Sequence, residues 1–182
     1  MDGTLYNTEP HHAIAFKMIL DEAGFNIKLD WSALEVKYKG WSDIQLYHEF
    51  MKFQKVDLTL ADFLKRKNEV IIKMFKENPP QMHPQMKALI EEAQKKKLKR
   101  GLVTSSERQI TMELLSTEKK LFECIITRED TPKNKPDPAP YFLGFKKLNC
   151  DAKRTVIFED SPTGLASANA TSALVYKVEW FA

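Results

Sequence analysis

The segment from Val156 to Ser161 constrains the fold of this chain more than any other stretch. It reads Val-Ile-Phe-Glu-Asp-Ser, and Pro162 follows it. A short run of β-branched and aromatic residues that ends at polar residues is typical of a buried strand. Glu159 and Asp160 then stand at the carboxyl end of this strand, which is where ligands bind in open α/β sheets.

Two adjacent carboxylates repel each other, so Glu159 and Asp160 need a compensating charge. A hard cation such as Mg²⁺ meets that need because it binds carboxylate oxygens and keeps positions open for water and phosphate. A solvated acidic loop after the strand is the alternative. The pair alone does not decide between a metal site and such a loop.

The sequence divides into two stretches with different patterns. Between Tyr6 and Pro80 the spacing of apolar residues predicts helices only, and after Pro80 strands and helices alternate. The expected helices are 10–24, 31–38, 43–53, 60–77, 83–96, 106–115, 141–148 and 162–170, and the expected strands are 100–104, 124–127, 155–158 and 173–178. Such alternation predicts βαβ units and one parallel sheet, with the carboxyl ends of its strands at one edge.

Polar side chains follow three of the predicted strands. A Thr-Ser-Ser run follows the first strand and opens a helix, Lys135 lies in the loop after the second, and the acidic pair follows the third. Hydroxyls and amides at a helix N-terminus can hold a phosphate, although Ser105 or Ser106 is also expected to cap that helix. A surface position is the alternative for Lys135. The joint placement of all three groups favours a phosphate site at this edge.

Four segments in order resemble the motifs of the haloacid dehalogenase-like superfamily: residues 2–9, 103–105, 135–138 and 158–164. The similarity is to its phosphatase and phosphomutase branch, of the β-phosphoglucomutase-like type, in which a small helical cap is inserted after the first motif. The resemblance implies an α/β fold with a Rossmann-like parallel sheet. Residues 1–10 and 80–182 are then the catalytic core, and residues 11–79 the all-helical cap.

The resemblance also implies roles for individual residues. Asp2 matches the general acid/base of the first motif, Thr104 the phosphate-binding hydroxyl, and Lys135 the lysine that neutralises charge. Glu159 and Asp160 match the acids that bind Mg²⁺, together with Asp2. The nucleophilic Asp of the motif belongs two positions before Asp2, immediately before Met1. The chain as written is therefore expected not to form an aspartyl-phosphate.

Four further residues are expected to contact substrate. Ser105 adjoins the phosphate-binding hydroxyl, and Lys39 and Trp41 lie in a segment that resembles the cap loop facing the active site. His12 resembles a hinge-side histidine that couples cap closure to the general acid. Packing between cap and core is the alternative for Trp41, and a solvent-facing helix position is the alternative for His12.

The predicted function is a Mg²⁺-dependent phosphatase of small phosphorylated metabolites, such as sugar phosphates. A sugar phosphomutase is the first alternative, although Asp43 stands where a mutase often has an arginine for the second phosphate. A non-catalytic, truncated binding module is the second. The net charge of +3 over 182 residues does not argue for nucleic acid, no apolar run reaches membrane length, and two cysteines suit a reducing compartment. We therefore expect a cytoplasmic monomer.

Overall fold

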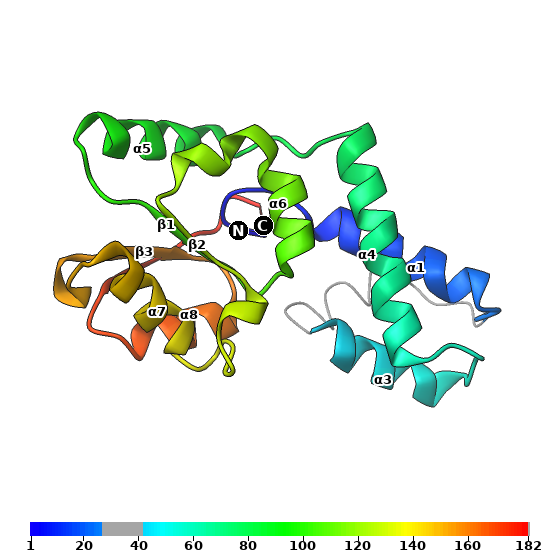
Figure 1. The fold of residues 1–182 in the computed structure, drawn as a ribbon. Coiled ribbons are helices and arrows are strands. Elements are labelled where there is room, and N and C mark those ends of the chain that lie inside the picture. Colours follow the sequence, from blue (N-terminus) through cyan, green and yellow to red (C-terminus); the bar gives the residue numbers. More distant parts are fainter. Residues whose placement is uncertain (27–41, 182) are drawn as a thin grey trace. The chain divides into compact units, whose positions relative to one another are not determined.

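The computed structural model describes residues 1–26 and 42–181, and the chain forms two compact units (Figure 1). The first unit consists of Met1–Thr8 and Pro79–Ala182, and the second consists of Glu9–Asn78. The second unit is thus inserted into the sequence of the first, directly after its opening segment.

Helices alone build the described part of the second unit. They are α1 (Glu9–Glu22), α3 (Asp43–Phe53) and α4 (Leu60–Glu77). The side chains of Ser42 and Thr59 accept hydrogen bonds from backbone N–H groups in the first turns of α3 and α4, so both helices begin at a side-chain N-cap and have the predicted bounds. The helix expected at 31–38 lies outside the described residues.

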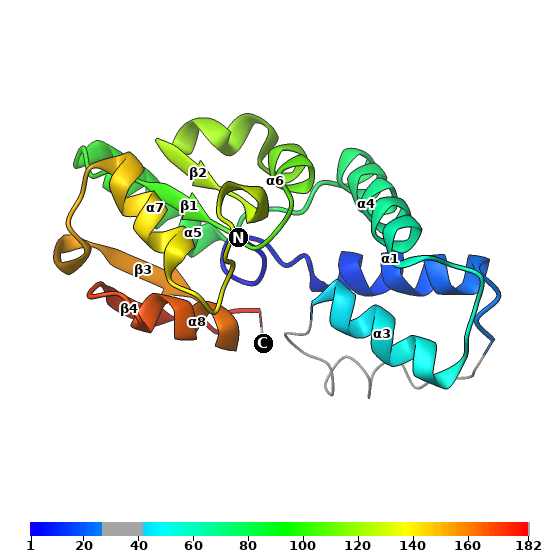
Figure 2. The same cartoon turned by 60° about the horizontal axis from the view of Figure 1, so that its bottom comes forward.

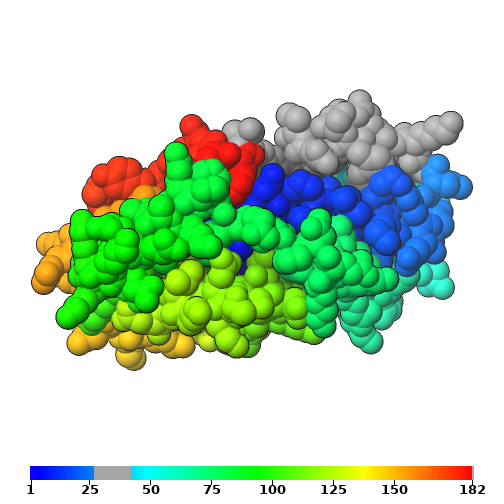
Figure 3. All heavy atoms as spheres, turned by 90° about the horizontal axis from the view of Figure 1, so that it is seen from above, coloured from blue at the N-terminus to red at the C-terminus, as the bar shows by residue number. Residues whose placement is uncertain are grey.

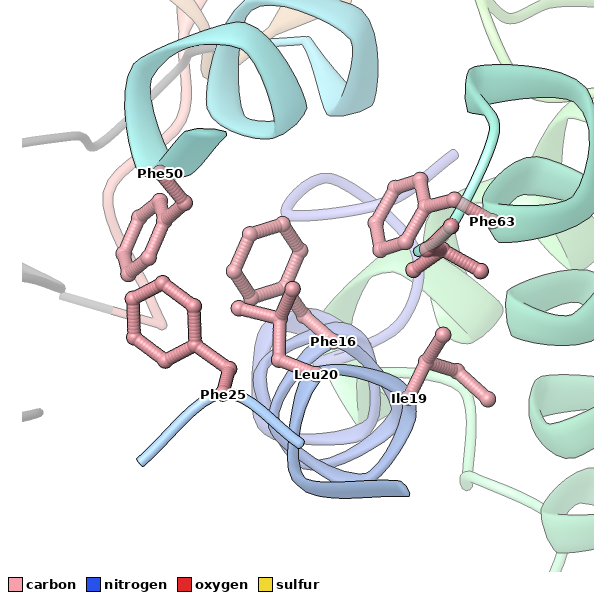
Figure 4. Packing of buried hydrophobic residues seen from close by; sticks show 7 residues of the cluster. Phe16, Ile19, Leu20, Phe25, Phe50 and Phe63 are labelled. Atoms are coloured by element: carbon pink, nitrogen blue, oxygen red, sulfur yellow. The ribbon is translucent and has the colours of Figure 1, made fainter. Parts of the chain in front are cut away.

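Aromatic rings dominate the core of the second unit (Figure 4). The Phe16 ring of α1 meets Phe50 of α3 edge-on at 4.9 Å and Phe63 of α4 at 5.2 Å between centroids. Gly24, with φ of +84°, ends α1 and lets the chain turn so that Phe25 returns to the same core. The remaining buried members of this cluster are Ile19, Leu20 and Leu58.

Strands and helices alternate in the first unit, as predicted. Its strands are β1 (Gly101–Val103), β2 (Cys124–Ile126), β3 (Val156–Glu159) and β4 (Leu174–Lys177). Its α-helices are α5 (Pro84–Lys95), α6 (Arg108–Leu115), α7 (Ala139–Leu148) and α8 (Pro162–Asn169). Short 3₁₀ turns are η1 (Ser116–Leu121), η2 (Arg128–Asp130) and η3 (Ala152–Arg154).

The strands pair in parallel, but as two sheets rather than one (Figure 2). Leu102 of β1 is in register with Ile125 of β2, and Ile157 of β3 with Val175 of β4. The prediction of a single sheet is therefore wrong for the described residues, because no hydrogen-bonded ladder joins β1 to β3 there. Residues 1–6 do not form a ladder that connects β1 to β3, because Gly3, Leu5 and Tyr6 donate their backbone N–H groups within that segment.

Helix packing still unites the two strand pairs in one core. Helix α7 packs against β1 and β2, and α8 packs against β3 and β4. Tyr141 and Phe145 of α7 share a buried cluster with Ile157 of β3 and Ala168 of α8. The parallel α/β architecture predicted from the sequence is thus present.

Helix α5 lies on the surface of the first unit, where Figure 3 shows it in green. Met86 and Ile90 are its buried residues, and Lys87 and Lys95 are exposed. Among the described helices, none combines the length and the apolar character needed to cross a membrane.

Candidate active site

Hydroxyl groups from two segments of the chain hold Asp2 by both of its carboxylate oxygens. Thr8 Oγ1 donates to Oδ1 at 2.6 Å, and Ser106 Oγ donates to Oδ2 from the turn that follows β1. Two hydroxyl donors on opposite oxygens orient the carboxylate without neutralising it. Such an arrangement suits a carboxylate that must present one orientation to a reacting group.

Gly3 brings the opening segment into contact with the end of β3. Its φ is +66°, and a Cβ at this position would lie 2.0 Å from Oδ2 of Asp160. Both the left-handed backbone and the close approach therefore require glycine here. Thr4 Oγ1 adds a hydrogen bond of 2.6 Å to Oδ1 of Asp160. Residues 156 positions apart in sequence thus meet at one point.

A buried lysine and a buried glutamate form the second half of the site. Lys135 Nζ donates to Oε1 of Glu159 and, at 3.1 Å, to the carbonyl of Val103 at the end of β1. The two charged side chains are only 7% and 6% exposed. Lys135 therefore links the carboxyl ends of β1 and β3, as the sequence predicts.

Tyr141 completes this part of the site, and sequence reasoning missed it. Its hydroxyl donates to Oε1 of Glu159 at 2.5 Å, and Lys135 Nζ lies 4.9 Å from the centre of its ring. On the far side of the carboxylate, a Cβ on Gly164 would lie 2.1 Å from Oε2. A hydroxyl-bearing aromatic residue in the helix just after Lys135 is the only sequence signal for this contact.

The two adjacent acids differ in their electrostatic balance. Burial by itself would raise the pKa of Glu159, but attraction to Lys135 and hydrogen bonds from Lys135 and Tyr141 hold that pKa below its ordinary value. Burial raises the pKa of Asp160 above its ordinary value, and the hydrogen bond from Thr4 and the positive charge of the Met1 amino group offset only part of this effect. Burial thus outweighs the partners of Asp160, whereas the partners of Glu159 outweigh its burial.

The Thr-Ser-Ser run lies where the sequence places it, but its serines do not cap α6. Thr104 is buried at the end of β1, and its Oγ1 accepts the backbone N–H of Ser106 at 3.1 Å. Helix α6 has Glu107 at the N-cap position, with no side-chain capping bond. The predicted serine cap is therefore wrong, because the Ser106 hydroxyl donates to Asp2 instead. Ser105 is exposed.

His12 belongs to the second unit, where its Nδ1 lies 2.9 Å from Nζ of Lys67. Lys67 also donates to Oδ1 of Asp43 at 2.6 Å and is 1% exposed. An ammonium group only donates, so Nδ1 of His12 accepts here. Lys67 was not predicted, although it shares the buried face of α4 with Phe63. Lys39 and Trp41, also expected to contact substrate, lie outside the described residues.

The expected magnesium ligands fit the ion unequally. Over residues 1–26 and 42–181, no group of three or more His, Cys, Asp or Glu side chains is arranged to hold a metal. Asp160, whose carboxylate accepts from the neutral hydroxyl of Thr4, has the chemistry of a ligand for a hard cation. Glu159 is engaged by Lys135 and Tyr141 at one oxygen and packs against Gly164 at the other.

Known proteins share both the sequence pattern and the fold of this chain. A sequence model of the haloacid dehalogenase-like hydrolases matches residues 1–178. A phosphorylated carbohydrates phosphatase of Thermotoga maritima is 27% identical over 176 residues, which cover 93% of this chain and 78% of that protein. A (DL)-glycerol-3-phosphatase 2 of Arabidopsis thaliana is 28% identical over 181 residues, covering 93% of this chain and 73% of that protein.

Among solved structures, a putative β-phosphoglucomutase of Thermotoga maritima superposes with a TM-score of 0.79 at 26% identity. The match covers 98% of this chain and 82% of that one. The CbbY structure of Rhodobacter sphaeroides in complex with phosphate has a TM-score of 0.83 at 24% identity. The match to CbbY covers 98% of this chain and 84% of the CbbY chain. At this identity the match supports the fold alone.

Three observations support the same family. The motif residues follow one another in the family's order, they meet at the ends of β1 and β3, and the family model matches residues 1–178. The chain belongs to the haloacid dehalogenase-like hydrolases, in the phosphatase and phosphomutase branch, and is an enzyme of the phosphoric monoester hydrolase class.

Proposed function

We propose that this chain is a Mg²⁺-dependent phosphatase of small phosphorylated metabolites, such as sugar phosphates. The observation that carries the proposal is the contact of Thr4 with Asp160, which brings the first motif to the acidic end of β3. The Thermotoga maritima relative, a phosphatase of phosphorylated carbohydrates, supports this class of substrate.

Asp2 is the proposed general acid and base. It protonates the leaving oxygen when the phosphoryl group is transferred, and then it takes a proton from the water that hydrolyses the phosphoenzyme. Thr8 and Ser106 hold its two oxygens in place for both steps. The aspartate that forms the phosphoenzyme belongs immediately before Met1, by the motif of the family.

Thr104, Ser105 and Lys135 are the proposed phosphate-binding groups. A phosphomonoester dianion repels an attacking carboxylate, so positive charge beside the phosphate lowers the barrier. Lys135 is the buried cation at the end of β1 and supplies that charge. Hydroxyl donors from residues 104 and 105 fix the orientation of the phosphate oxygens.

Mg²⁺ is the proposed cofactor, held by Asp160 together with Asp2 and Glu159. When bound, it would neutralise charge on the phosphate and on the attacking carboxylate. Asp160 supports this assignment most directly, because its carboxylate has, among the described residues, no ion pair with a lysine as Glu159 has. The engagement of Glu159 with Lys135 makes it the weakest of the three ligands.

The helices of residues 11–79 are proposed to act as a cap that selects the substrate, with residues 1–10 and 80–182 as the catalytic core. His12, Lys39 and Trp41 are its proposed substrate contacts. Both cysteines are free thiols, which supports a cytoplasmic location. The proposed partner is a small phosphorylated metabolite, without nucleic acid or membrane, and the proposed state is a monomer.

The test measures phosphate release from p-nitrophenyl phosphate and from a panel of sugar phosphates, with and without Mg²⁺. It compares the chain as written with two forms that carry either Asp or Asn immediately before Met1, each preceded by an added start methionine. We expect turnover only in the Asp form and only with Mg²⁺, and no turnover when Asp160 is replaced by Asn.

Each other result has a definite meaning. Equal turnover in the Asn form would refute the aspartyl-phosphate, and turnover without Mg²⁺ would refute the metal requirement. Binding of Mg²⁺ and phosphate without turnover in any form would favour a non-catalytic module. A phosphomutase would convert β-glucose 1-phosphate to glucose 6-phosphate, but Asp43, bonded to Lys67, stands where a mutase often has an arginine.

A further inference from the structure

Tyr141 is a buried titratable side chain to which the proposed mechanism assigns no role. It lies in the first turn of α7 and is 5% exposed. Its hydroxyl donates to Oε1 of Glu159 at 2.5 Å, and its ring lies 4.9 Å from Nζ of Lys135. It therefore touches both members of the buried ion pair.

The carboxylate of Glu159 is held on both sides. Oε1 accepts from the Lys135 ammonium and from the Tyr141 hydroxyl, and Oε2 packs against the backbone of Gly164. The carboxylate cannot move toward α8, since even a methyl group at residue 164 would overlap it. Glu159 thus has one fixed position. The tyrosine hydroxyl is one of three side-chain donors to its carboxylate, with Lys135 at Oε1 and Ser161 Oγ at 3.5 Å from Oε2.

The Lys135 ammonium is shared between Glu159 and any phosphate bound at the strand ends. A carboxylate that accepts a second hydrogen bond has part of its charge satisfied by that donor, so it attracts the lysine less strongly. Without the phenol, Oε1 would have the ammonium as its remaining strong donor among the contacts described. The lysine would then be held closer to Glu159 and would have less charge to offer a phosphate.

We propose that Tyr141 is a positioning residue. Its hydrogen bond to Glu159 weakens the attraction between Glu159 and Lys135, which leaves more of the Lys135 charge available to the substrate phosphate. The inference rests on the proposed function, because it assigns a purpose to the lysine that the phosphate site contains. It differs from a role in packing alone, since packing needs the ring of residue 141 and not its hydroxyl.

The test uses Tyr141→Phe, which keeps the ring and removes the hydroxyl, with Tyr176→Phe as the matched control. Tyr176 is 52% exposed on β4 and stacks on Phe158. The affinity for inorganic phosphate, measured by calorimetry in the presence of Mg²⁺, should fall about three- to tenfold in Tyr141→Phe. It should stay within about twofold of the original in Tyr176→Phe, and both variants should melt cooperatively.

A second measurement follows Lys135 itself. Reductive methylation is read by mass spectrometry over a time course that labels about half of Lys135 in the original chain. Positioning predicts slower labelling of Lys135 in Tyr141→Phe, because the lysine pairs more tightly with Glu159. A loosened site predicts faster labelling, so faster or unchanged labelling would overturn the proposal.

The two measurements separate the possible failures. If the original chain does not bind phosphate, the phosphate site of the proposed function is wrong, and the labelling still decides whether Tyr141 controls Lys135. If phosphate binds equally well to the original chain and to Tyr141→Phe, the positioning role is wrong and the proposed function stands.

Discussion

Replacing Asp43 by Ala should destabilise the protein much more than replacing Lys67 by Met, although both changes remove the same ion pair. Lys67 is 1% exposed on α4, and Asp43, in the first turn of α3, keeps 31% of its side chain exposed. The aspartate can therefore be solvated when its partner is lost. The lysine cannot, because it would remain buried with an uncompensated charge.

The magnitudes follow from that difference in burial. Removing one partner of a buried pair costs about 3–5 kcal/mol. His12 still accepts from Lys67, and water reaches Asp43, so we expect a loss of roughly 2–3 kcal/mol for Asp43→Ala. Lys67→Met removes the buried charge and keeps much of the volume, so its cost should stay within about 1 kcal/mol.

Thermal unfolding followed by far-ultraviolet circular dichroism is the assay. At about 2–4 °C per kcal/mol for a chain of this size, the melting temperature should fall by roughly 4–12 °C in Asp43→Ala and by at most about 4 °C in Lys67→Met. The double variant should recover most of the loss of Asp43→Ala. A Lys67→Met variant that is as unstable as Asp43→Ala would refute the reasoning, since the ion pair would then stabilise the fold outright.

Three further predictions concern the first unit. Gly164→Ala should lose about 1–3 kcal/mol of unfolding free energy and most phosphate binding, because its Cβ would overlap Glu159, although alanine normally favours a helix. Trp180→Phe should cost about 1 kcal/mol in chemical denaturation, because the Trp180 indole N–H donates to the Thr4 carbonyl at 3.0 Å. Asp130→Asn should flatten the loss of stability between about pH 5 and pH 2.

The sign of the Asp130 effect follows from its hydrogen bonds. Burial would raise its pKa, but donors from Thr127 and Arg108 hold that pKa below its ordinary value. A pKa lower in the folded than in the unfolded state gives stability above the ordinary aspartate pKa, and this stability is lost as the pH falls. An unchanged acid-side slope in Asp130→Asn would contradict this account.

Controls exist for the other two changes. Gly144→Ala in α7 places a Cβ no closer than 3.3 Å to Val103, so it should be tolerated where Gly164→Ala is not. Equal effects of the two alanines would show that the close contact with Glu159 is unimportant. A Trp180→Phe variant as stable as the original would show that the Thr4 carbonyl finds another donor.

Local patterns predicted local structure well. The bounds of α3 and α4 were predicted correctly, because each helix begins at a cap that needs only one side chain and the backbone three residues away. The strands β1–β4 appear within two residues of their predicted bounds, since a short apolar run between turn residues is itself a local signal. The order of motif residues also predicted that Lys135 and Glu159 would meet.

Contacts between distant segments were decided only by the fold. The serine cap failed because Ser106 donates to a residue 104 positions away, a competitor that no local pattern shows. Lys67 and Tyr141 were missed for the same reason, since their partners Asp43 and Glu159 lie 24 and 18 positions from them. The prediction of a single sheet was wrong because strand pairing is a contact between segments far apart in the chain, which the sequence of each strand does not show.

The sequence by itself thus determined the elements, the family and the chemical groups of the site, because motif spacing and apolar periodicity are properties of the chain alone. The tertiary structure decided which hydrogen-bond donors each carboxylate meets and how deeply each is buried. Glu159 and Asp160 are neighbours in sequence, yet only Glu159 meets Lys135 and Tyr141. Their different electrostatic balance comes from burial and partners, which exist only in the folded chain.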